Sequence, residues 1–230
     1  MLRVFIGFDE NEAVTYHVLA HSIMRHATVP VSVAPLCLNQ LPMTRERDEC
    51  QSTEFAYSRF LVPWLCHYEG TAVFMDSDML FRWDIADLMK EHRPDVDVSV
   101  VKHDYISKQQ IKFLGYKQTA YDKKNWSSLM VFNNWRCHAL SVDTVNEQTG
   151  MYLHQFKWAR EVGELSKDWN HLVGEYEKND LAKNVHFTLG SPCFAKYFEC
   201  EYSKEWHEEW KMMNHYNRVG EYSLEAKGAA

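Results

Sequence analysis

Two aspartates separated by one residue, Asp76 and Asp78, directly follow the apolar segment Thr71–Met75. Because this segment does not alternate apolar and polar residues, it predicts a strand buried on both faces of a parallel sheet. Ligands of open α/β sheets bind beyond the carboxyl ends of such strands. Side chains two residues apart on an extended chain point to the same side, so both carboxylates can bind one divalent cation. The alternative is a strand that simply ends in an acidic turn, with Asp78 capping the next element.

Composition limits the classes of protein to which the chain can belong. The 230 residues suit one large domain, or one with a modest appendage, and a hydrophobic fraction of 46% can supply a substantial core. A formal net charge of −7 argues against a nucleic-acid partner. The six cysteines include no CxxC pair, and neither a signal peptide nor a membrane span is recognised. These features predict a soluble, cytoplasmic protein with reduced thiols.

The elements that would position the aspartates follow an alternating order. Strands are expected at Arg3–Phe8, Val31–Leu36, Thr71–Met75, Val96–Val101, Ser127–Phe132 and His186–Leu189. Helices are expected from Asp9 or Asn11 to Met24, over Thr53–His67, where Pro63 should end or kink the helix, and over Asp84–Glu91. The polar segment Lys102–Asn125 is typical of a lid or a pocket wall. This order predicts an α/β fold with a mostly parallel central sheet flanked by helices.

Three segments, taken together, resemble a known family. Phe5–Asp9 ends the first predicted strand, Tyr57–Arg59 lies ahead of the strand that carries the two aspartates, and His186–Gly190 closes the sheet region. In this order they resemble the GT-A glycosyltransferases, most closely glycosyltransferase family 8, which includes glycogenin and bacterial lipopolysaccharide galactosyltransferases. The resemblance covers about residues 3 to 195. It implies a GT-A fold and transfer of a sugar, with retention of configuration, from a nucleoside-diphosphate sugar.

The resemblance implies that Asp76, Asp78 and His186 bind one divalent cation. That cation would neutralise the charge that develops on the departing diphosphate. Two carboxylates and one imidazole suit Mn²⁺ better than Mg²⁺, which prefers oxygen ligands. The sequence contains 12 histidines, and taken alone His186 would be interpreted as a histidine with a structural role. Ser77, between the aspartates, and Gly190, at the end of the histidine segment, are included among the donor-binding residues.

The nucleotide of the donor, by the same resemblance a uridine, would bind at Gly7, Phe8 and Asp9. Gly7 has no side chain, which permits the close approach of a flat base, and Asp9 would accept a hydrogen bond from the base. The alternative for Asp9 is a helix cap. Arg59 offers a planar fork suited to the diphosphate or to holding an aspartate ligand in place. Its alternative is a surface arginine paired with Glu54 or with an aspartate at position 48.

The chain departs from the family pattern around the donor sugar. Where relatives carry Asn-Ala-Gly, this chain has Ser127 and Ser128 after a tryptophan, and both serines are candidate sugar contacts. The family's Asp-Gln pair is matched only in part by Asp168–Asn170, in which Asp168 is the candidate catalytic residue. A lysine that follows the late histidine in the family is replaced by Pro192, and the nearest lysine is Lys196.

Two other classes of protein compete with a glycosyltransferase. A haloacid-dehalogenase-like phosphatase also carries Asp-x-Asp at a strand end, but on its first strand and with Thr or Val where this chain has Leu80. A non-catalytic module that binds nucleotide sugars would share the donor site without turnover. The acceptor, whether carbohydrate, lipid or protein, is not identified by any motif.

The end of the chain predicts an extension attached to the catalytic domain. Residues 1–200 would form that domain, and 201–230 a helical extension packed on it. Trp206, Trp210 and Met213 recur at i, i+4 and i+7, which predicts one apolar helix face that covers the sheet. Membrane attachment is not expected, because between residues 201 and 211 four glutamates outnumber two lysines, which disfavours an anionic bilayer.

Overall fold

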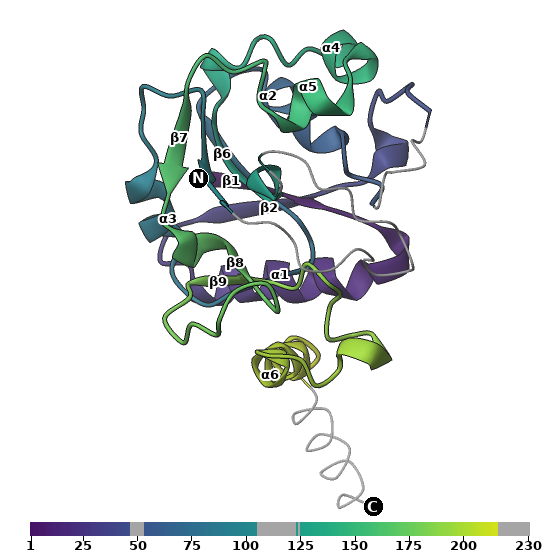
Figure 1. Ribbon diagram of the computed structural model, residues 1–230, viewed down its shortest axis with the longest axis vertical. Helices are drawn as coiled ribbons and strands as arrows, with labels where there is room; N and C mark the ends of the chain where they lie inside the picture. The colour runs from purple at the N-terminus through teal and green to yellow at the C-terminus, as the bar shows by residue number, and fades with distance from the viewer. Residues whose placement is uncertain (47–52, 105–122, 124, 216–230) are drawn as a thin grey trace, which may run out of the picture.

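The computed structural model describes residues 1–46, 53–104, 123 and 125–215 (Figure 1). Its centre is a six-stranded sheet in the order β2-β1-β3-β6-β5-β7. These strands are β1 (Leu2–Gly7), β2 (Val31–Leu36), β3 (Thr71–Met75), β5 (Val98–Val101), β6 (Leu129–Asn133) and β7 (Val162–Leu165). The neighbouring strands pair in parallel, except that β6 runs antiparallel to β3 and β5. The predicted mostly parallel α/β sheet is therefore confirmed.

Helices cover both faces of this sheet. The helices that contribute residues to the hydrophobic cores are α1 (Ala13–His26), α2 (Val62–Leu65), α3 (Ile85–Glu91), α4 (Val142–Glu147), α5 (Gly150–His154) and α6 (Ser203–Met213). On one face, α2, α4 and α5 pack against the sheet, and on the other face α1 and α3 do so (Figure 1). Ala72 and Phe74 of β3 enter the first core, whereas Val73 and Met75 enter the second. Strand β3 is thus buried on both faces, as its unbroken apolar run predicted.

A second, smaller sheet lies beyond the end of β3. It contains β4 (Met79–Phe81), β8 (His171–Leu172) and β9 (Asn184–His186), in the order β4-β9-β8. Strand β4 follows β3 after only three residues and pairs antiparallel with β9. The predicted strand over His186–Leu189 was wrong in its extent, because His186 is the last residue of β9 and Phe187 begins a turn. The structure therefore brings the late histidine to the start of β4.

The predicted long helix over Thr53–His67 is wrong. The chain forms turns, a 3₁₀-helix at Ser58–Leu61 and then the short helix α2. Pro63 lies in the first turn of α2, where backbone N–H groups have no partner within the helix and proline costs nothing. Proline therefore marks the start of a helix here, not its end. The predicted segment Lys102–Asn125 lies mostly outside the described residues.

Helix α6 packs on α1 and on the small sheet, so the prediction that it covers the sheet needs correction. Trp206 is 3% exposed and joins Val18 of α1 and Leu80 of β4 in one cluster. Trp210 is 36% exposed, whereas Glu209 is buried. The prediction put Trp206, Trp210 and Met213 on the buried face of α6. In the structure that face includes Glu209, one residue before Trp210, and Trp210 is turned toward solvent. In the part of the chain that the structure describes, no helix is both long and apolar enough to span a membrane.

Glu209 is buried because it joins α6 to α1 by ionic contacts. Its carboxylate accepts hydrogen bonds from Arg25 at 2.6 Å and lies 2.6 Å from Nδ1 of His21. Hydrogen bonding to Glu209 raises the pKa of the Arg25 guanidinium, so that cation stays charged. A carboxylate can be buried at this place because two basic groups of α1 satisfy it. The division into 1–200 and 201–230 stays a prediction.

We expect Trp206→Ala to lower the free energy of unfolding by about 3–5 kcal/mol, because it leaves a cavity between α6, α1 and the small sheet. Trp210→Ala is the matched control on the same helix, and its half-exposed side chain predicts a much smaller loss. Urea denaturation of both variants measures the difference. Equal losses would contradict the packing described here.

Candidate metal and nucleotide site

Asp76, Asp78 and His186 meet at the carboxyl end of β3. The chain crosses from the large sheet to the small sheet at Asp76–Asp78, and the β4–β9 ladder places His186 opposite Met79. Nε2 of His186 lies 3.1 Å from Oδ1 of Asp78 and 4.0 Å from Oδ2 of Asp76. One ligand atom from each residue can be chosen so that all lie within 4.8 Å of one another. The three residues that the sequence assigned to one cation are therefore brought together.

A further acidic side chain lies beside this cluster. Glu12, which the sequence analysis missed, is 8% exposed, and the pKa of its carboxyl is raised to about 9 by burial, then by Asp78, Asp9 and Asp76. Glu12 follows Asp9 by three residues, about one helical turn, so the two side chains lie on the same face. That spacing is the sequence signal that could have identified Glu12 as a neighbour of the site. A set of two half-buried carboxylates and one buried imidazole fits a divalent cation, because that cation would relieve the repulsion between the carboxylates.

Arg59 is the cation that the structure places against Asp76. Its Nη1 lies 2.8 Å from Oδ1 of Asp76 and donates to the Ser127 carbonyl at 2.9 Å, while Nε donates to the Phe55 carbonyl at 3.2 Å. The guanidinium is 4.9 Å from the ring centre of Phe74. At 6% exposure it is not a surface arginine, so that alternative is wrong. The proposed role in holding Asp76 agrees with these contacts, and diphosphate binding stays a prediction.

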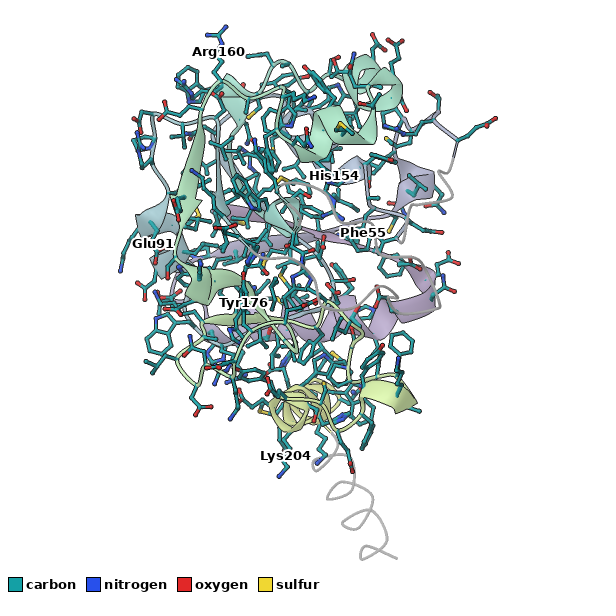
Figure 2. The ribbon with its side chains drawn as sticks, viewed as in Figure 1. Phe55, Glu91, His154, Arg160, Tyr176 and Lys204 are labelled. Atoms are coloured by element: carbon teal, nitrogen blue, oxygen red, sulfur yellow. The ribbon has the colours of Figure 1, made fainter. Side chains whose placement is uncertain are left out.

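Ser127 and Ser128 lie in a 3₁₀-helix at Trp126–Ser128 that precedes β6, not in the strand itself. The hydroxyl of Ser127 lies 2.8 Å from Nδ1 of His154, which is the last residue of α5. His154 lies on the side of α5 that faces the sheet (Figure 2). The hydroxyl of Ser128 donates to the Asn125 carbonyl at 2.6 Å. Both hydroxyls are engaged inside the protein, so contact with a donor sugar stays a prediction.

Gly7 and Asp9 contact protein groups at the end of β1. A Cβ added to Gly7 would lie 2.3 Å from the ring of Phe55, so that ring fills the space expected for a flat base. Asp9 caps the 3₁₀-helix Glu10–Glu12, with Oδ1 accepting from the backbone N–H of Asn11 at 3.0 Å. The cap interpretation of Asp9 is thus confirmed. Phe8, half-buried, packs edge-on against Tyr16, and a contact of these residues with a nucleotide stays a prediction.

The remaining donor-site candidates are Gly190 in the turn after β9, Ser77 between β3 and β4, and Lys196 in a 3₁₀-helix at Ala195–Tyr197. Gly190 has a φ of +148°, and a Cβ at this position would lie 2.1 Å from the ring of Tyr197. Lys196 is exposed, with Nζ 5.1 Å from the centre of the same ring. Ser77 is 1% exposed. Gly190 is therefore explained by backbone conformation and close packing, and donor contacts of all three residues stay predictions.

We expect Gly190→Ala to lower the free energy of unfolding by about 1–3 kcal/mol, because it combines an unfavourable φ with overpacking. The same change made together with Tyr197→Ala should cost less, since the ring that meets the new Cβ is gone. Urea denaturation of the four proteins in this cycle measures the coupling. Strict additivity of the two changes would contradict the clash.

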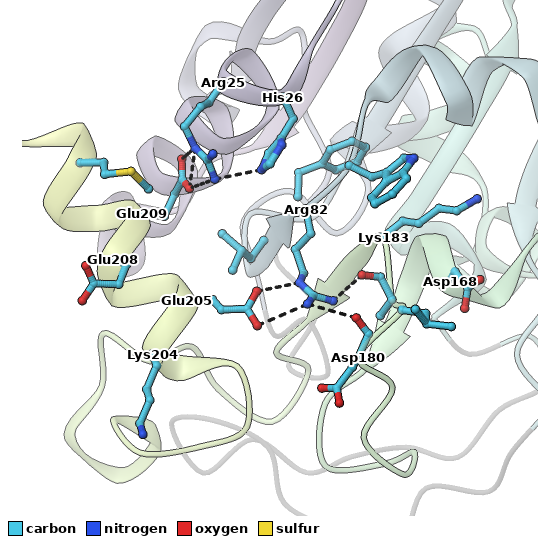
Figure 3. Close-up of a pocket in the computed structure, with 16 residues that line it drawn as sticks. Arg25, His26, Arg82, Asp168, Asp180, Lys183, Lys204, Glu205, Glu208 and Glu209 are labelled. Carbon is cyan, nitrogen blue, oxygen red and sulfur yellow. Dashed lines mark hydrogen bonds and ion pairs between the residues drawn. The ribbon is translucent and has the colours of Figure 1, made fainter.

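Asp168 has a hydrogen-bond partner outside the metal cluster. It is part of a 3₁₀-helix, Lys167–Asn170, and Oδ1 accepts a hydrogen bond from Nδ2 of Asn179 at 3.0 Å. It lines a cavity of about 700 Å³ between the end of α1, β4 and α6 (Figure 3). Asp76, Asp78 and His186 are not among the residues that line this cavity. The catalytic role of Asp168 stays a prediction.

The fold defines a class of protein. No protein-family model matches the chain. The galactosyltransferase LgtC, solved with donor and acceptor sugar analogues, superposes with a TM-score of 0.56 at 10% identity, covering 92% of this chain and 96% of that one. GlyE of Streptococcus pneumoniae TIGR4 gives 0.61 at 12% identity, covering 96% and 65%. The bifunctional WbbM gives 0.59 at 17%, covering 90% of this chain and about half (51%) of that one. The fold is the GT-A glycosyltransferase fold, as predicted.

Sequence similarity identifies the family more narrowly. Protein CDI of Arabidopsis thaliana is 37% identical over 229 residues, covering 94% of this chain and 88% of that protein. The chain belongs to the same family as Protein CDI.

Proposed function

We propose that this protein is a metal-dependent glycosyltransferase that uses a nucleoside-diphosphate sugar, with uridine as the nucleoside. The observation that carries the proposal is the meeting of Asp76, Asp78 and His186 at the carboxyl end of β3 in a GT-A fold. Ligand sites of open α/β sheets lie at this edge. LgtC, which shares the fold, was solved with donor and acceptor sugar analogues, which supports a sugar donor and a carbohydrate acceptor here.

Mn²⁺ is the cation proposed for the cluster, with Mg²⁺ as its substitute. When bound, it would supply the positive charge that stabilises a departing diphosphate. Arg59 is already paired with Asp76 and donates to two backbone carbonyls, so part of its positive charge is neutralised before a donor binds. Because the site is otherwise acidic, a diphosphate should be repelled unless the cation is present. Donor affinity is therefore proposed to depend on the metal, and transfer to proceed with retention.

A non-catalytic nucleotide-sugar-binding module is the second candidate. It is favoured by one observation, that Asp168, the candidate catalytic residue, lines the cavity near α6, whose lining does not include Asp76, Asp78 or His186. The phosphatase alternative is wrong, because the fold is GT-A and the two aspartates follow the third strand of the chain instead of the first.

Release of UDP from a panel of UDP-sugars, with Mn²⁺ and with a small-sugar acceptor, separates the two candidates. A glycosyltransferase should release UDP and form a glycoside whose anomeric configuration, determined by NMR, matches that of the donor. Metal-dependent donor binding without any turnover across the panel would favour the binding module. Turnover with inversion would leave the enzyme class intact and contradict retention.

A further inference from the structure

We propose that Asn170 is a positioning residue that fixes the tautomer and the orientation of His186 for metal binding. The inference rests on the proposed metal site. Oδ1 of Asn170 lies 2.9 Å from Nδ1 of His186, while Nε2 of the same ring faces Asp78 at 3.1 Å. Asn170 is fully buried, and His186 is 2% exposed. The two ring nitrogens therefore face different partners, one an amide and the other the carboxylates.

The orientation of the Asn170 amide is determined by its other neighbours. Nδ2 lies 3.3 Å from the backbone carbonyl of Asn125 and 2.8 Å from the hydroxyl of Ser128. A carbonyl oxygen can only accept, so the amide nitrogen must face it. The Ser128 hydroxyl gives its own proton to the Asn125 carbonyl at 2.6 Å, which leaves a lone pair to accept from Asn170. The amide oxygen consequently faces His186.

This orientation selects one tautomer of His186. An amide oxygen only accepts, so Nδ1 of His186 carries the proton, and in the neutral ring Nε2 then has a free lone pair. Nε2 is the atom that faces Asp76 and Asp78. A metal-binding histidine needs this lone pair, and the partner of its second nitrogen sets the ring direction. Asn170 thus prepares the histidine to act as a ligand.

Ser128 connects this arrangement to the first aspartate ligand. Its backbone carbonyl accepts from the N–H of Asp76 at 2.8 Å, and its hydroxyl accepts from Asn170. Ser128, the residue that precedes β6, therefore holds both the backbone of Asp76 and the amide of Asn170, which directs His186. This explains why the polar groups of Ser128 face inward.

Asn170→Leu tests the proposal, because leucine has a similar size and neither donates nor accepts. In the metal-free protein labelled with ¹⁵N-histidine, long-range ¹H–¹⁵N spectra should show Nδ1–H for His186 in the wild type and a changed or mixed tautomer in the variant. Mn²⁺ affinity, measured by electron paramagnetic resonance with the metal alone, should fall about 10- to 100-fold. Asn134→Leu is the matched control, since Asn134 is equally buried and its amide donates to the Glu69 carbonyl.

The control should keep both the tautomer and the Mn²⁺ affinity. Should Asn170→Leu fail to fold, Ser128→Ala removes a single hydroxyl and should still weaken Mn²⁺ binding. An unchanged tautomer, or Mn²⁺ affinity within twofold of wild type in the folded variant, would overturn the proposal. If the wild type itself binds no Mn²⁺, the proposed function fails, and the spectra still decide whether Asn170 sets the tautomer of His186.

Discussion

Asp78→Asn is expected to abolish Mn²⁺-dependent UDP binding. Loss of a residue that only supports a ligand costs about 10- to 100-fold in metal affinity, so loss of a ligand should cost at least as much. The fold should survive, because Asp78 is among the charges that raise the pKa of Glu12, and removing it relieves repulsion among half-buried acidic groups. We therefore expect an unfolding free energy equal to or above that of the wild type.

Isothermal titration of UDP in the presence of Mn²⁺, together with urea denaturation, measures both effects. Asp87→Asn is the matched control, since Asp87 pairs with Lys90 on the surface of α3. This control should keep its UDP affinity. Full UDP affinity in Asp78→Asn would remove Asp78 from the site, and a large loss of stability would contradict the electrostatic description of the cluster.

Arg59→Lys is expected to weaken both the fold and the site. The guanidinium joins Asp76 to the Ser127 and Phe55 carbonyls, and a lysine ammonium is a point charge that cannot reproduce this planar arrangement. Leaving buried acceptors unsatisfied predicts a loss of about 1–3 kcal/mol in unfolding free energy. Metal-dependent UDP affinity should fall as well, because Asp76 loses the group that orients it.

Arg93→Lys provides the control, since Arg93 is an exposed arginine paired with Asp95 and Glu161. Its effect should stay within about 0.5 kcal/mol, and its UDP affinity should not change. Equal effects of the two replacements would show that Arg59 has no special role.

The sequence predicts the features of the site that depend on local pattern. An unbroken apolar run predicts a strand buried on both sides, and β3 enters both cores. The position of Asp76 and Asp78 follows directly from that strand. His186 is far along the chain, and its approach to Asp78 depends on the pairing of β4 with β9, so only the family resemblance could place it.

Other features depend on how a helix is rotated, which pattern alone does not determine. Asp168 and Asn170 are two residues apart in a 3₁₀-helix, where that spacing turns the side chains by about 240°. One therefore lines the cavity near α6, and the other reaches His186. Rotation of α6 similarly buries Glu209 and leaves Trp210 half exposed, because Arg25 and His21 on α1 satisfy the carboxylate.

Titration of UDP into the wild-type protein, once with Mn²⁺ and once in excess chelator, tests the central claim most directly. Asp76, Asp78 and His186 can hold a cation, and the two aspartates should repel a diphosphate without one. We predict heat of binding with Mn²⁺ and none in the chelator. Equal UDP affinity in the two conditions would contradict a metal-dependent nucleotide site.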